Sequence, residues 1–587
     1  MQVHRLFEIP EHQLAHGAKR ESIATKENGS WKAYSTQELV DLSDRLARGL
    51  MALGIGPGDR VAIASGNRSE WCLLDQAILR AGAINVPIYP TSSVEDYSYV
   101  LQHSEAKICF CSNAEILAKA SVAQKASPPL QHVFTFDRLA GQRHWSEVAP
   151  LGESVPVAEL QKRKDGVKRA DLATIIYTSG TTGRPKGVML SHDNILSNVE
   201  ASAERLPVDA TGRCISFLPL CHIYERMLMY LYLYVGVSIH FQESMDDLGD
   251  RIREVKPEVF TAVPRVLEKV YERIIAKGEE QTGMKRKLFF WALDLGLRYE
   301  VHGRSPWYNM QLAVARKLVF SKWRAALGGN VRCVSSGSAA LQPRLARVFN
   351  AAGIPLMEGY GLTETSPVVS VNDARNDGLR FGYVGRPLKD VQVRIADDGE
   401  ILVKGPNVMM GYYLEPELTR DVLDPDGWFH TGDIGEVSAD GFLRITDRKK
   451  EIFKTSGGKY VAPQVIENKL KASRFVEQAI VIGENRKFPA ALIVPNFNFL
   501  KDYCALKEIP FTDRQQVIGD KRILDRLMKE VDTANLGLGH WEQVKKIILL
   551  PQEFSIETGE LTPTLKLRRK PILTRYAALI DALYEDC

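Results

Sequence analysis

The 587-residue sequence lacks a long hydrophobic run. Its longest uncharged apolar stretch extends from Met227 to Ile239, which is well short of the roughly 20 residues that a membrane-spanning helix needs. The N-terminal stretch MQVHRLFEIPEHQLAHGAKRE has no continuous apolar core of the kind found in a signal peptide. From these absences we expect a protein that is soluble or peripheral to a membrane.

The eight cysteines form no CxxC pair, so the sequence suggests neither a disulfide framework nor a zinc site. This pattern fits the reducing cytosol. Low-complexity tracts and internal repeats are also missing, and the net charge of +4 is spread along the chain, which gives no reason to expect a nucleic-acid partner. What the composition indicates is a globular protein, and the length implies several domains.

Helices and strands alternate in the first part of the chain. Ser35-Thr-Gln-Glu38 is a capping box followed by leucines at helical spacing, which predicts a helix over residues 35–54. Strands are predicted over residues 60–64 and 84–88, with a helix over residues 71–81 between them. Strands that alternate with helices indicate parallel α/β layers, here arranged as two layered subdomains.

The pattern changes after about residue 380, where short predicted strands are separated by Gly, Asp and Pro turns. These strands are predicted over residues 391–395, 400–403 and 442–445. They indicate an antiparallel β subdomain. The charged run Asp447-Arg-Lys-Lys-Glu451 then interrupts the apolar pattern. We therefore predict a large α/β domain over residues 1–447 and a small α+β domain over residues 448–587.

The stretch Tyr177-Thr-Ser-Gly-Thr-Thr-Gly-Arg-Pro-Lys-Gly-Val188 combines glycines, hydroxyls and one lysine in a loop between two predicted strands. Glycines let backbone amides approach phosphate oxygens, while the hydroxyls donate hydrogen bonds and the lysine adds positive charge. The candidate phosphate ligands are Thr178, Ser179, Gly180, Thr181, Thr182, Gly183 and Lys186. The loop indicates ATP as the ligand, and a glycine-rich turn without a ligand is the alternative.

The loop is not the P-loop of common nucleotide hydrolases, because Pro185 has no amide to donate and biases Arg184 away from helical geometry. It resembles instead the phosphate-binding signature of the adenylate-forming superfamily, which contains acyl-CoA synthetases, peptide-synthetase adenylation domains and firefly luciferase. Met357-Glu-Gly-Tyr-Gly-Leu-Thr-Glu-Thr365 is similar to the adenine and magnesium motif of that superfamily, and Val334–Leu341 resembles a second adenine-lining segment.

The resemblance implies adenine contacts along both segments, since a tyrosine between glycines can lie against a base. These contacts are expected at Gly337, Ser338, Ala339, Glu358, Gly359, Tyr360 and Gly361. Thr363 is expected to donate to the α-phosphate. Glu364 offers the hard oxygen ligand that Mg²⁺ prefers, and Thr181 is the second candidate magnesium ligand.

The run Asp426–Gly435, continuing through Asp440 to Lys450, resembles the fatty acyl-CoA synthetase signature within the superfamily. Asp433 matches the aspartate that accepts both ribose hydroxyls, a task for two carboxylate oxygens. Arg448 matches a ribose or phosphate contact. By the same resemblance, Ile445 lines the nucleotide site and Lys450 is the hinge candidate.

Leu218-Pro-Leu-Cys-His-Ile-Tyr-Glu-Arg226 resembles the segment whose histidine lies where the acyl group arrives. His222 is expected to orient the reacting carboxylate or gate its access. It is not expected to act as a base, because forming an anhydride from a carboxylate removes no proton. A structural histidine is the alternative.

The tail Glu557–Lys570 resembles the C-terminal lysine motif of the superfamily. Lys566 is assigned to the lysine that spans the carboxylate and the α-phosphate, where a cation lowers the repulsion between two anions. Glu560 departs from the usual pattern, so Lys570 stays as a second candidate, and Arg568 and Arg569 are expected to be solvated.

Ser456-Gly-Gly-Lys-Tyr460 occupies the position where relatives present a glycine turn to CoA. Gly457 and Gly458 are expected to let the pantetheine pass close to the backbone.

The resemblance extends from about residue 30 to residue 570. It implies an AMP-forming acyl-CoA synthetase, most like the long-chain fatty acid branch. It implies ATP, Mg²⁺ and coenzyme A, a fatty acid substrate, and two half-reactions separated by a swing of a mobile C-terminal domain. The alternatives are an acyl-AMP ligase, a medium-chain or aryl acid CoA ligase, and a catalytically silent lipid-binding relative.

Residues 275–327 form a predicted helical segment that is rich in basic and aromatic side chains. Such a face suits anionic lipid, and we expect peripheral contact with the cytoplasmic face of a membrane. An ordinary packing helix is the alternative. The sequence does not determine acyl selectivity, the pathway or the oligomeric state. A homodimer is compatible with the sequence.

Overall fold

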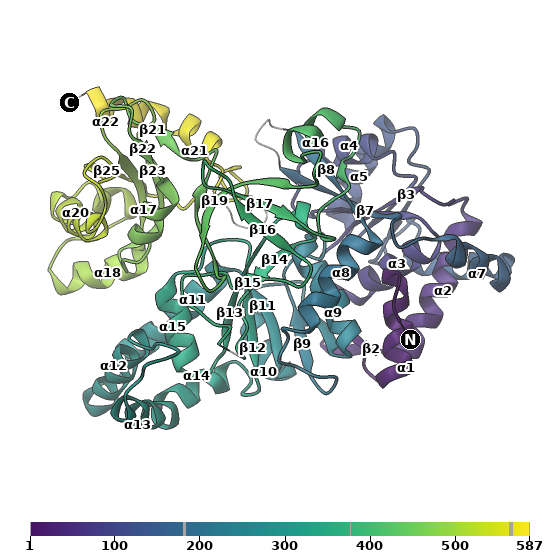
Figure 1. Ribbon diagram of the computed structural model, residues 1–587, viewed down its shortest axis with the longest axis horizontal. Coiled ribbons are helices and arrows are strands. Elements are labelled where there is room, and N and C mark those ends of the chain that lie inside the picture. Colours follow the sequence, from purple (N-terminus) through teal and green to yellow (C-terminus); the bar gives the residue numbers. More distant parts are fainter. Residues whose placement is uncertain (1, 180–183, 376, 563–566, 586–587) are drawn as a thin grey trace. The chain divides into compact units, whose positions relative to one another are not determined.

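The computed structural model describes residues 2–179, 184–375, 377–562 and 567–585 (Figure 1). The chain divides into two compact units. The large unit comprises Met1–Val393, Val403–His430 and Ala439–Leu443, and the small unit comprises Arg394–Leu402, Thr431–Ser438 and Arg444–Cys587. A mixed α/β fold with a large and a small part was predicted, and this fold class is confirmed. The boundary at residue 447 stays a prediction.

One layer of the large unit is built on the β3 sheet, whose strand order is β18-β8-β7-β4-β3-β5-β6. Its strands are β3 (Arg60–Ala64), β4 (Ile84–Ile88), β5 (Ile108–Cys111), β6 (His132–Thr135), β7 (Leu172–Ser179), β8 (Pro185–Ser191) and β18 (Gly411–Tyr412). The strands from β7 to β6 in this order are parallel, whereas β8 runs antiparallel to both β7 and β18.

Helices cover both faces of the β3 sheet because successive side chains of a strand point to opposite faces. Val61 and Ile63 pack in one core cluster, and Ala62 and Ala64 pack in another. The covering helices are α2 (Thr36–Ala52), α3 (Ser69–Arg80), α4 (Val94–His103) and α5 (Ala114–Ala126). The predicted capping box is present, since the Ser35 hydroxyl accepts from the Glu38 amide.

The second layer of the large unit is the β11 sheet, whose strand order is β15-β14-β13-β12-β11-β9-β10-β1-β2. Its strands are β1 (Ile23–Glu27), β2 (Ser30–Tyr34), β9 (Arg213–Ser216), β10 (Ser238–Phe241), β11 (Val259–Ala262), β12 (Cys333–Ser336), β13 (Leu356–Gly361), β14 (Val368–Val371) and β15 (Arg386–Pro387). The strands from β1 to β13 in this order are parallel.

Helices α9 (Ile223–Val235), α10 (Leu248–Val255) and α15 (Pro343–Ala351) contact strands of the β11 sheet. Further helices pack against these or against one another: α8 (His192–Ala203), α11 (Pro264–Glu279), α12 (Gly283–Leu297), α13 (Pro306–Ala315) and α14 (Ser321–Ala326). Most of the segment 275–327 is helical, as predicted. The apolar run from Met227 to Ile239 forms most of the buried helix α9 and the start of β10. Within the described ranges, no helix is long and apolar enough to cross a membrane.

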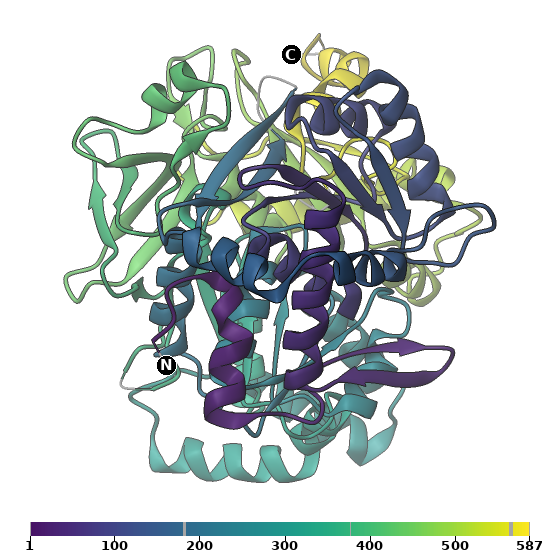
Figure 2. The same ribbon diagram turned by 90° about the vertical axis from the view of Figure 1, so that its right-hand side faces the viewer.

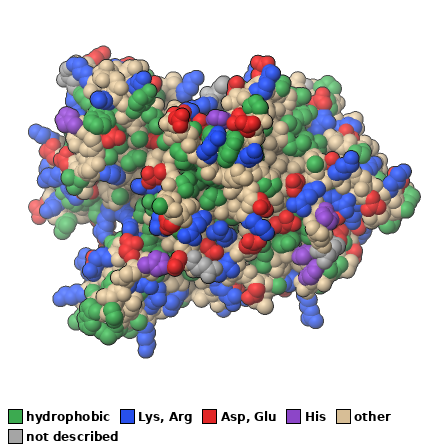
Figure 3. Space-filling view, viewed as in Figure 1, with side chains coloured by type: hydrophobic (Ala, Val, Ile, Leu, Met, Phe, Trp, Pro, Cys, Tyr) green, Lys and Arg blue, Asp and Glu red, His purple; other side chains and the backbone are tan. Residues whose placement is uncertain are grey.

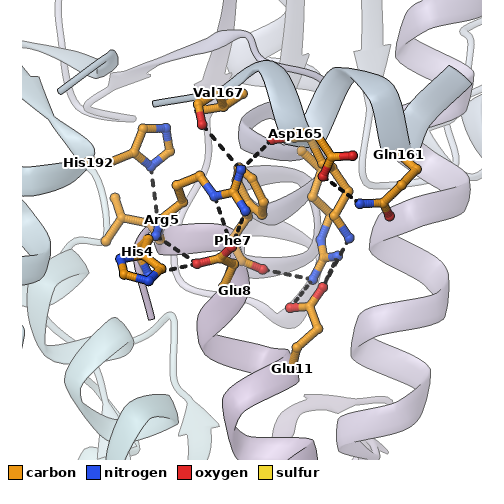
Figure 4. A network of polar contacts seen from close by, with 12 residues as sticks. His4, Arg5, Phe7, Glu8, Glu11, Gln161, Asp165, Val167 and His192 are labelled. Atoms are coloured by element: carbon orange, nitrogen blue, oxygen red, sulfur yellow. Dashed lines mark hydrogen bonds and ion pairs between the residues drawn. The ribbon is translucent and has the colours of Figure 1, made fainter. Parts of the chain in front are cut away.

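The N-terminal segment is tied to the β3 sheet helices by a polar network (Figure 4). Arg5 bonds Glu8 and donates to the carbonyls of Lys164 and Val167, at the end of α7 (Val157–Gly166), over 2.6 and 3.2 Å. The Leu6 amide donates to Nδ1 of His192 over 3.2 Å. Burial lowers the pKa of His192 to about 3, so its ring stays neutral at neutral pH.

Helices α1 (Ile9–Gly17) and α2 pack side by side in the same region, as the purple helices of Figure 2 show. The buried Arg80 guanidinium joins them to α3 by donating to Glu11 over 2.5 Å and to Asp44 over 2.9 Å. A buried charge is stable only when it is paired in this way.

The small unit has its own core, which is packed on the sheet β23 (Val476–Ile482), β24 (Ala490–Pro495) and β25 (Lys546–Leu549). Its helices are α17 (Pro463–Leu470), α18 (Phe497–Leu506), α19 (Arg514–Ile518), α20 (Lys521–Asn535), α21 (Arg569–Arg575) and α22 (Ala577–Glu585). A short hairpin, β21 (Phe453–Lys454) and β22 (Tyr460–Val461), precedes them.

The short strands predicted after residue 380 are present in the sheet β16-β17-β19-β20. They are β16 (Gln392–Ile395), β17 (Glu400–Lys404), β19 (Phe429–Val437) and β20 (Leu443–Arg448). The division between the two units falls within these strands, so the chain leaves and re-enters each unit here.

Candidate active site

The two segments expected to line adenine lie next to each other in the large unit. Strands β12 and β13 are parallel neighbours, with Ser336 opposite Glu358. Because the carboxyl ends of parallel strands meet at one edge of a sheet, residues 337–339 and 359–361 share that edge. Ser338 has a φ of 73°, in the left-handed region that side chains other than glycine rarely adopt. The structure thus brings the expected adenine contacts together.

Glu358 links these two segments directly. Its Oε1 accepts a hydrogen bond from the Leu341 amide over 3.0 Å, and the residue is 7% exposed. Burial raises the pKa of the Glu358 carboxyl to about 8, so the group is mostly protonated at neutral pH. One oxygen of Glu358 therefore holds the two adenine-lining segments together, a role that the motif alone did not indicate.

The start of helix α9 reaches the same edge. His222 is the N-cap, and its Nδ1 accepts from the Tyr224 amide over 3.1 Å, which in a neutral ring leaves the proton on Nε2. The Tyr224 hydroxyl lies 2.9 Å from Ser335 Oγ, and a Cβ at Gly337 would lie 3.1 Å from the Tyr224 ring. Glycine at 337 is explained by this close packing. His222 is thus the N-cap of α9, and its expected contact with the reacting carboxylate stays a prediction.

The predicted phosphate-binding loop joins β7 to β8. Thr178 lies opposite Lys186 in this strand pair, and the Lys186 side chain is partly buried. The candidates Gly180, Thr181, Thr182 and Gly183 lie outside the described residues, and only the backbone of Ser179 is described. The two predicted flanking strands are present, but they extend into the expected loop, since Thr178 and Ser179 end β7 and residues 185–187 begin β8. The phosphate contacts stay a prediction.

Thr363 and Glu364 follow β13 in a single turn, and a segment that the motifs did not include reaches them. The Tyr412 hydroxyl donates to Glu364 Oε1 over 2.9 Å, and the Lys186 amine lies 5.0 Å from the centre of the Tyr412 ring. Burial, followed by the nearby Glu364 charge, raises the pKa of Tyr412, so the hydroxyl stays protonated. The only signal in the sequence was a tyrosine pair after Gly411.

The residues around Glu364 fit a magnesium ion that is held mainly by a nucleotide. Oε2 of Glu364 makes no hydrogen bond or ion pair to any residue that the structure describes. Across those residues, no group of three or more His, Cys, Asp or Glu side chains could hold a metal. Magnesium commonly binds through one or two carboxylates together with substrate phosphates, which is the arrangement that one free carboxylate oxygen allows.

In the small unit, the two expected ribose contacts are brought together on β19 and β20. Arg448 Nε lies 3.2 Å from Asp433 Oδ1, and the Asp433 side chain is 5% exposed whereas that of Arg448 is 45% exposed. Ile445 is partly buried on β20, and Lys450 is exposed just beyond it. The neighbouring Lys449 is anchored to Glu400 over 2.8 Å, so the charged run is fixed on one side of Lys450.

The glycine turn expected to meet CoA is the turn between β21 and β22. Gly458 has a φ of 75°, which explains a glycine there by backbone geometry alone. A Cβ at Gly458 would meet nothing within 4 Å, and one at Gly457 would lie 3.9 Å from Thr455 Oγ1. The turn is open to a ligand, and its contact with CoA stays a prediction.

The tail around the expected lysine is only partly described. Lys566 lies outside the described residues, and Lys570 is exposed on α21. Glu560, where the sequence departs from the usual motif, is 1% exposed and pairs with Arg575 over 3.1 Å. The departure therefore has a structural explanation within the small unit.

The expectation that Arg569 is solvated is wrong. Its guanidinium bonds Glu467, lies 3.2 Å from Glu451 Oε2 and donates to the Val481 carbonyl over 2.8 Å. The Arg569 side chain is 16% exposed. A run of basic residues does not reveal which member finds a buried carboxylate, because that depends on the fold. Arg568 is exposed, as expected.

The chain belongs to the AMP-binding enzyme family. Residues 11–413 match that family, and residues 450–587 match the AMP-binding enzyme C-terminal domain. The resemblance to the adenylate-forming superfamily is thereby confirmed.

Individual relatives cover nearly the whole chain. It is 38% identical to the long-chain-fatty-acid–CoA ligase FadD15 of Mycobacterium bovis, over 95% of this chain and 93% of that protein. It is 33% identical to the peroxisomal long chain acyl-CoA synthetase 7 of Arabidopsis thaliana, over 97% and 84%. Among solved structures, the adenylation domain of a carboxylate reductase from Mycobacterium chelonae superimposes with a TM-score of 0.75 at 22% identity, over 99% and 91%.

Proposed function

We propose that this protein is an AMP-forming long-chain fatty acid CoA ligase. It converts ATP, a fatty acid and coenzyme A into acyl-CoA, AMP and pyrophosphate through an acyl-adenylate. The observation that carries the proposal is similarity over nearly the full length to relatives named as long-chain fatty acid CoA ligases. The shared edge of adenine-lining segments supports the nucleotide part of the reaction.

In the first half-reaction, the fatty carboxylate attacks the α-phosphate of ATP and pyrophosphate leaves. Lys186 supplies positive charge to the phosphates, and Thr363 donates to the α-phosphate. His222 donates from Nε2 to the carboxylate, which orients it. Lys566 would supply a cation between the two anions, which offsets their repulsion and stabilises charge on phosphorus.

Glu364, with Thr181, would hold the magnesium ion, which when bound neutralises phosphate charge. In the second half-reaction, the CoA thiolate attacks the acyl carbonyl and AMP leaves. The C-terminal domain, residues 448–587, swings about Arg448 to Lys450 between the two reactions, which withdraws Lys566 and presents Gly457 and Gly458 to the pantetheine.

The decisive experiment measures AMP release by the purified protein with ATP, Mg²⁺ and palmitate, with and without CoA. We expect release that requires both palmitate and CoA, and a panel of saturated acids then defines the preferred chain length. Release of AMP-linked product without CoA would indicate an acyl-AMP ligase. Absence of fatty-acid-dependent exchange between ATP and pyrophosphate would indicate a silent lipid-binding relative.

We also propose that the α12–α13 face rests on an anionic membrane. This face is defined by Met284, Trp307, Met310, Val314 and Leu318, which are between 44% and 78% exposed. Four of the five recur every three or four residues along residues 306–320, so they lie on one side of a continuous helix. Figure 3 shows apolar side chains gathered at the lower left, where Figure 1 labels α12 and α13.

The charge of this segment favours an anionic surface. Residues 283–326 contain nine lysines and arginines and two acidic residues. Apolar side chains that enter a lipid interface beside cationic ones are typical of peripheral membrane binding. Of the aromatic residues expected there, Trp307 is exposed, whereas Trp323 is buried in the core. The apolar part of the face is therefore mostly aliphatic, and not the aromatic surface that the sequence suggested.

Replacement of Trp307 and Leu318 by serine tests the membrane proposal. We expect co-sedimentation with anionic liposomes at low salt to fall several-fold, because apolar area in the interface is lost. Leu506→Ser is the matched control, since Leu506 is 78% exposed in the small unit. Equal sedimentation of all three proteins would contradict the proposal.

A homodimer stays a prediction, which light scattering of the purified protein tests.

A further inference from the structure

A short segment, Met409–Tyr413, lies between two candidate ligand-binding elements of the large unit. On one side its backbone amides donate to β8, from Met410 to the Met189 carbonyl over 3.0 Å and from Tyr413 to the Gly187 carbonyl over 2.7 Å. On the other side, the Met409 amide donates to the Glu364 carbonyl over 2.9 Å. The segment therefore holds the strand that carries Lys186 next to the turn that carries Glu364.

Tyr412 makes the side-chain contacts of this segment. Its hydroxyl bonds Glu364 Oε1 and its ring faces the Lys186 amine, at the distances given above. The residue is 6% exposed, and its own amide donates to Thr419 Oγ1 over 2.9 Å. The Thr419 hydroxyl in turn donates to the Glu415 carbonyl over 2.9 Å. Tyr412 is therefore held by its backbone and has little freedom to turn away.

Lys186 and Glu364 carry opposite charges and both contact Tyr412, the lysine at the ring and the glutamate at the hydroxyl, and both belong to the described part of the chain. No ion pair joins them. A ring face attracts a cation without neutralising it, and a hydroxyl that donates to one carboxylate oxygen leaves the other oxygen to a further ligand. An acidic residue at 412 would pair with the lysine and take its charge away from a phosphate.

We propose that Tyr412 is a positioning residue that keeps Lys186 and Glu364 apart and oriented for magnesium-bound ATP. This inference rests on the proposed function. The hydroxyl of Tyr412 fixes the Glu364 carboxylate so that Oε2 is presented to the cation. Groups that orient a metal ligand in this way commonly change metal affinity when they are removed. The ring of Tyr412 fixes the lysine, whose charge stays available to the phosphates.

The test compares Tyr412→Phe, which keeps the ring, with Tyr412→Leu, which loses it. ATP binding is measured by calorimetry in the absence of fatty acid, with EDTA and over a range of Mg²⁺ concentrations. For Tyr412→Phe we expect the Mg²⁺ concentration at half-maximal effect to rise about tenfold, with ATP affinity in EDTA unchanged. For Tyr412→Leu we expect ATP affinity in EDTA to fall as well, by about threefold or more.

Tyr413→Phe is the matched control, since it alters the adjacent tyrosine and leaves the backbone bonds in place. A second control is Glu364→Gln, in which the Tyr412→Phe change should have no further effect on the Mg²⁺ dependence because it acts through that carboxylate. Wild-type Mg²⁺ dependence in Tyr412→Phe would overturn the inference. So would an equal loss of affinity with and without Mg²⁺, which a merely structural role produces. If the wild-type protein binds no magnesium-bound ATP, the proposed function itself fails.

Discussion

The candidate residues of the large unit and those of the small unit are presented in different ways. In the large unit, Glu358, Thr363 and Tyr412 are between 6% and 8% exposed, and Glu358 and Tyr412 are held by hydrogen bonds between segments distant in sequence. In the small unit, Lys450 and Lys570 are exposed on turns or helix ends. A preorganised nucleotide site needs rigid support, whereas a group that must arrive and leave needs to be accessible.

The largest expected effect comes from removing the adenylation lysine of the small unit. Replacement of Lys566 by alanine should lower the rate of acyl-AMP formation by about 10²–10³-fold, the size seen when one preorganised charge-stabilising group is removed. The measurement is fatty-acid-dependent exchange between ATP and pyrophosphate. Release of AMP from preformed acyl-AMP with CoA should stay within a few-fold of wild type.

Lys570→Ala is the matched control for that experiment, and we expect exchange near the wild-type rate because Lys570 is exposed on α21. The reverse result, with loss of exchange in Lys570→Ala and not in Lys566→Ala, would transfer the role to Lys570. Full exchange in both variants would remove the tail lysine from the adenylation reaction.

The second largest effect concerns Asp433, the buried carboxylate of the small unit that is assigned to the ribose of ATP. Asp433→Ala should weaken ATP binding by about 10–100-fold, because hydrogen bonds to a charged group contribute about 1.5–3 kcal/mol. Equilibrium binding of ATP is the measurement. Asp440→Ala is the control, since Asp440 makes an exposed ion pair with Arg380 and such pairs contribute little. Equal affinities in the two variants would contradict the ribose assignment.

A smaller effect concerns the large unit and its pH dependence. The folded pKa of His192 is about 3, below its ordinary value of about 6.5, so the unfolded chain binds more protons between these values. This contribution to stability is present above pH 6.5 and is lost as the pH falls toward 3, by about 1.4 kcal/mol per pH unit. Denaturant unfolding between pH 7 and pH 4.5 measures it.

His192→Gln should flatten this pH dependence, because the side chain stays neutral and keeps an acceptor for the Leu6 amide. At pH 7 we expect the variant to be less stable than wild type, since the buried ring packs edge-on against Phe7. An unchanged slope below pH 6.5 would show that other groups dominate acid unfolding.

Much of the fold could be predicted from local patterns. The strands over residues 60–64 and 84–88 and the capped helix after Ser35 are found where they were expected, since hydrophobic periodicity and caps are local signals. Helix α20 was not anticipated, although its apolar residues pack into the core of the small unit.

The site could be predicted only in part. Motifs indicated the adenine-lining segments, the phosphate loop and the pair Asp433 and Arg448. The structure brings the first and the last of these groups together within their own units, whereas residues 180–183 of the loop lie outside the described residues. The roles of Glu358 and Tyr412 required the tertiary structure, because their partners lie 17 and 48 positions away. The expectation that Arg569 is solvated was wrong for the same reason, because its partners are also distant in sequence.

The sequence by itself determined the family, the α/β class and the order of the motifs, because glycine spacing, hydroxyl-rich loops and apolar periodicity act over a few neighbouring residues. Tertiary structure alone decided which carboxyl groups are buried, which cations are paired and which tyrosine contacts both Lys186 and Glu364. These properties depend on desolvation and on distances of a few ångströms between remote segments, and no local pattern encodes them.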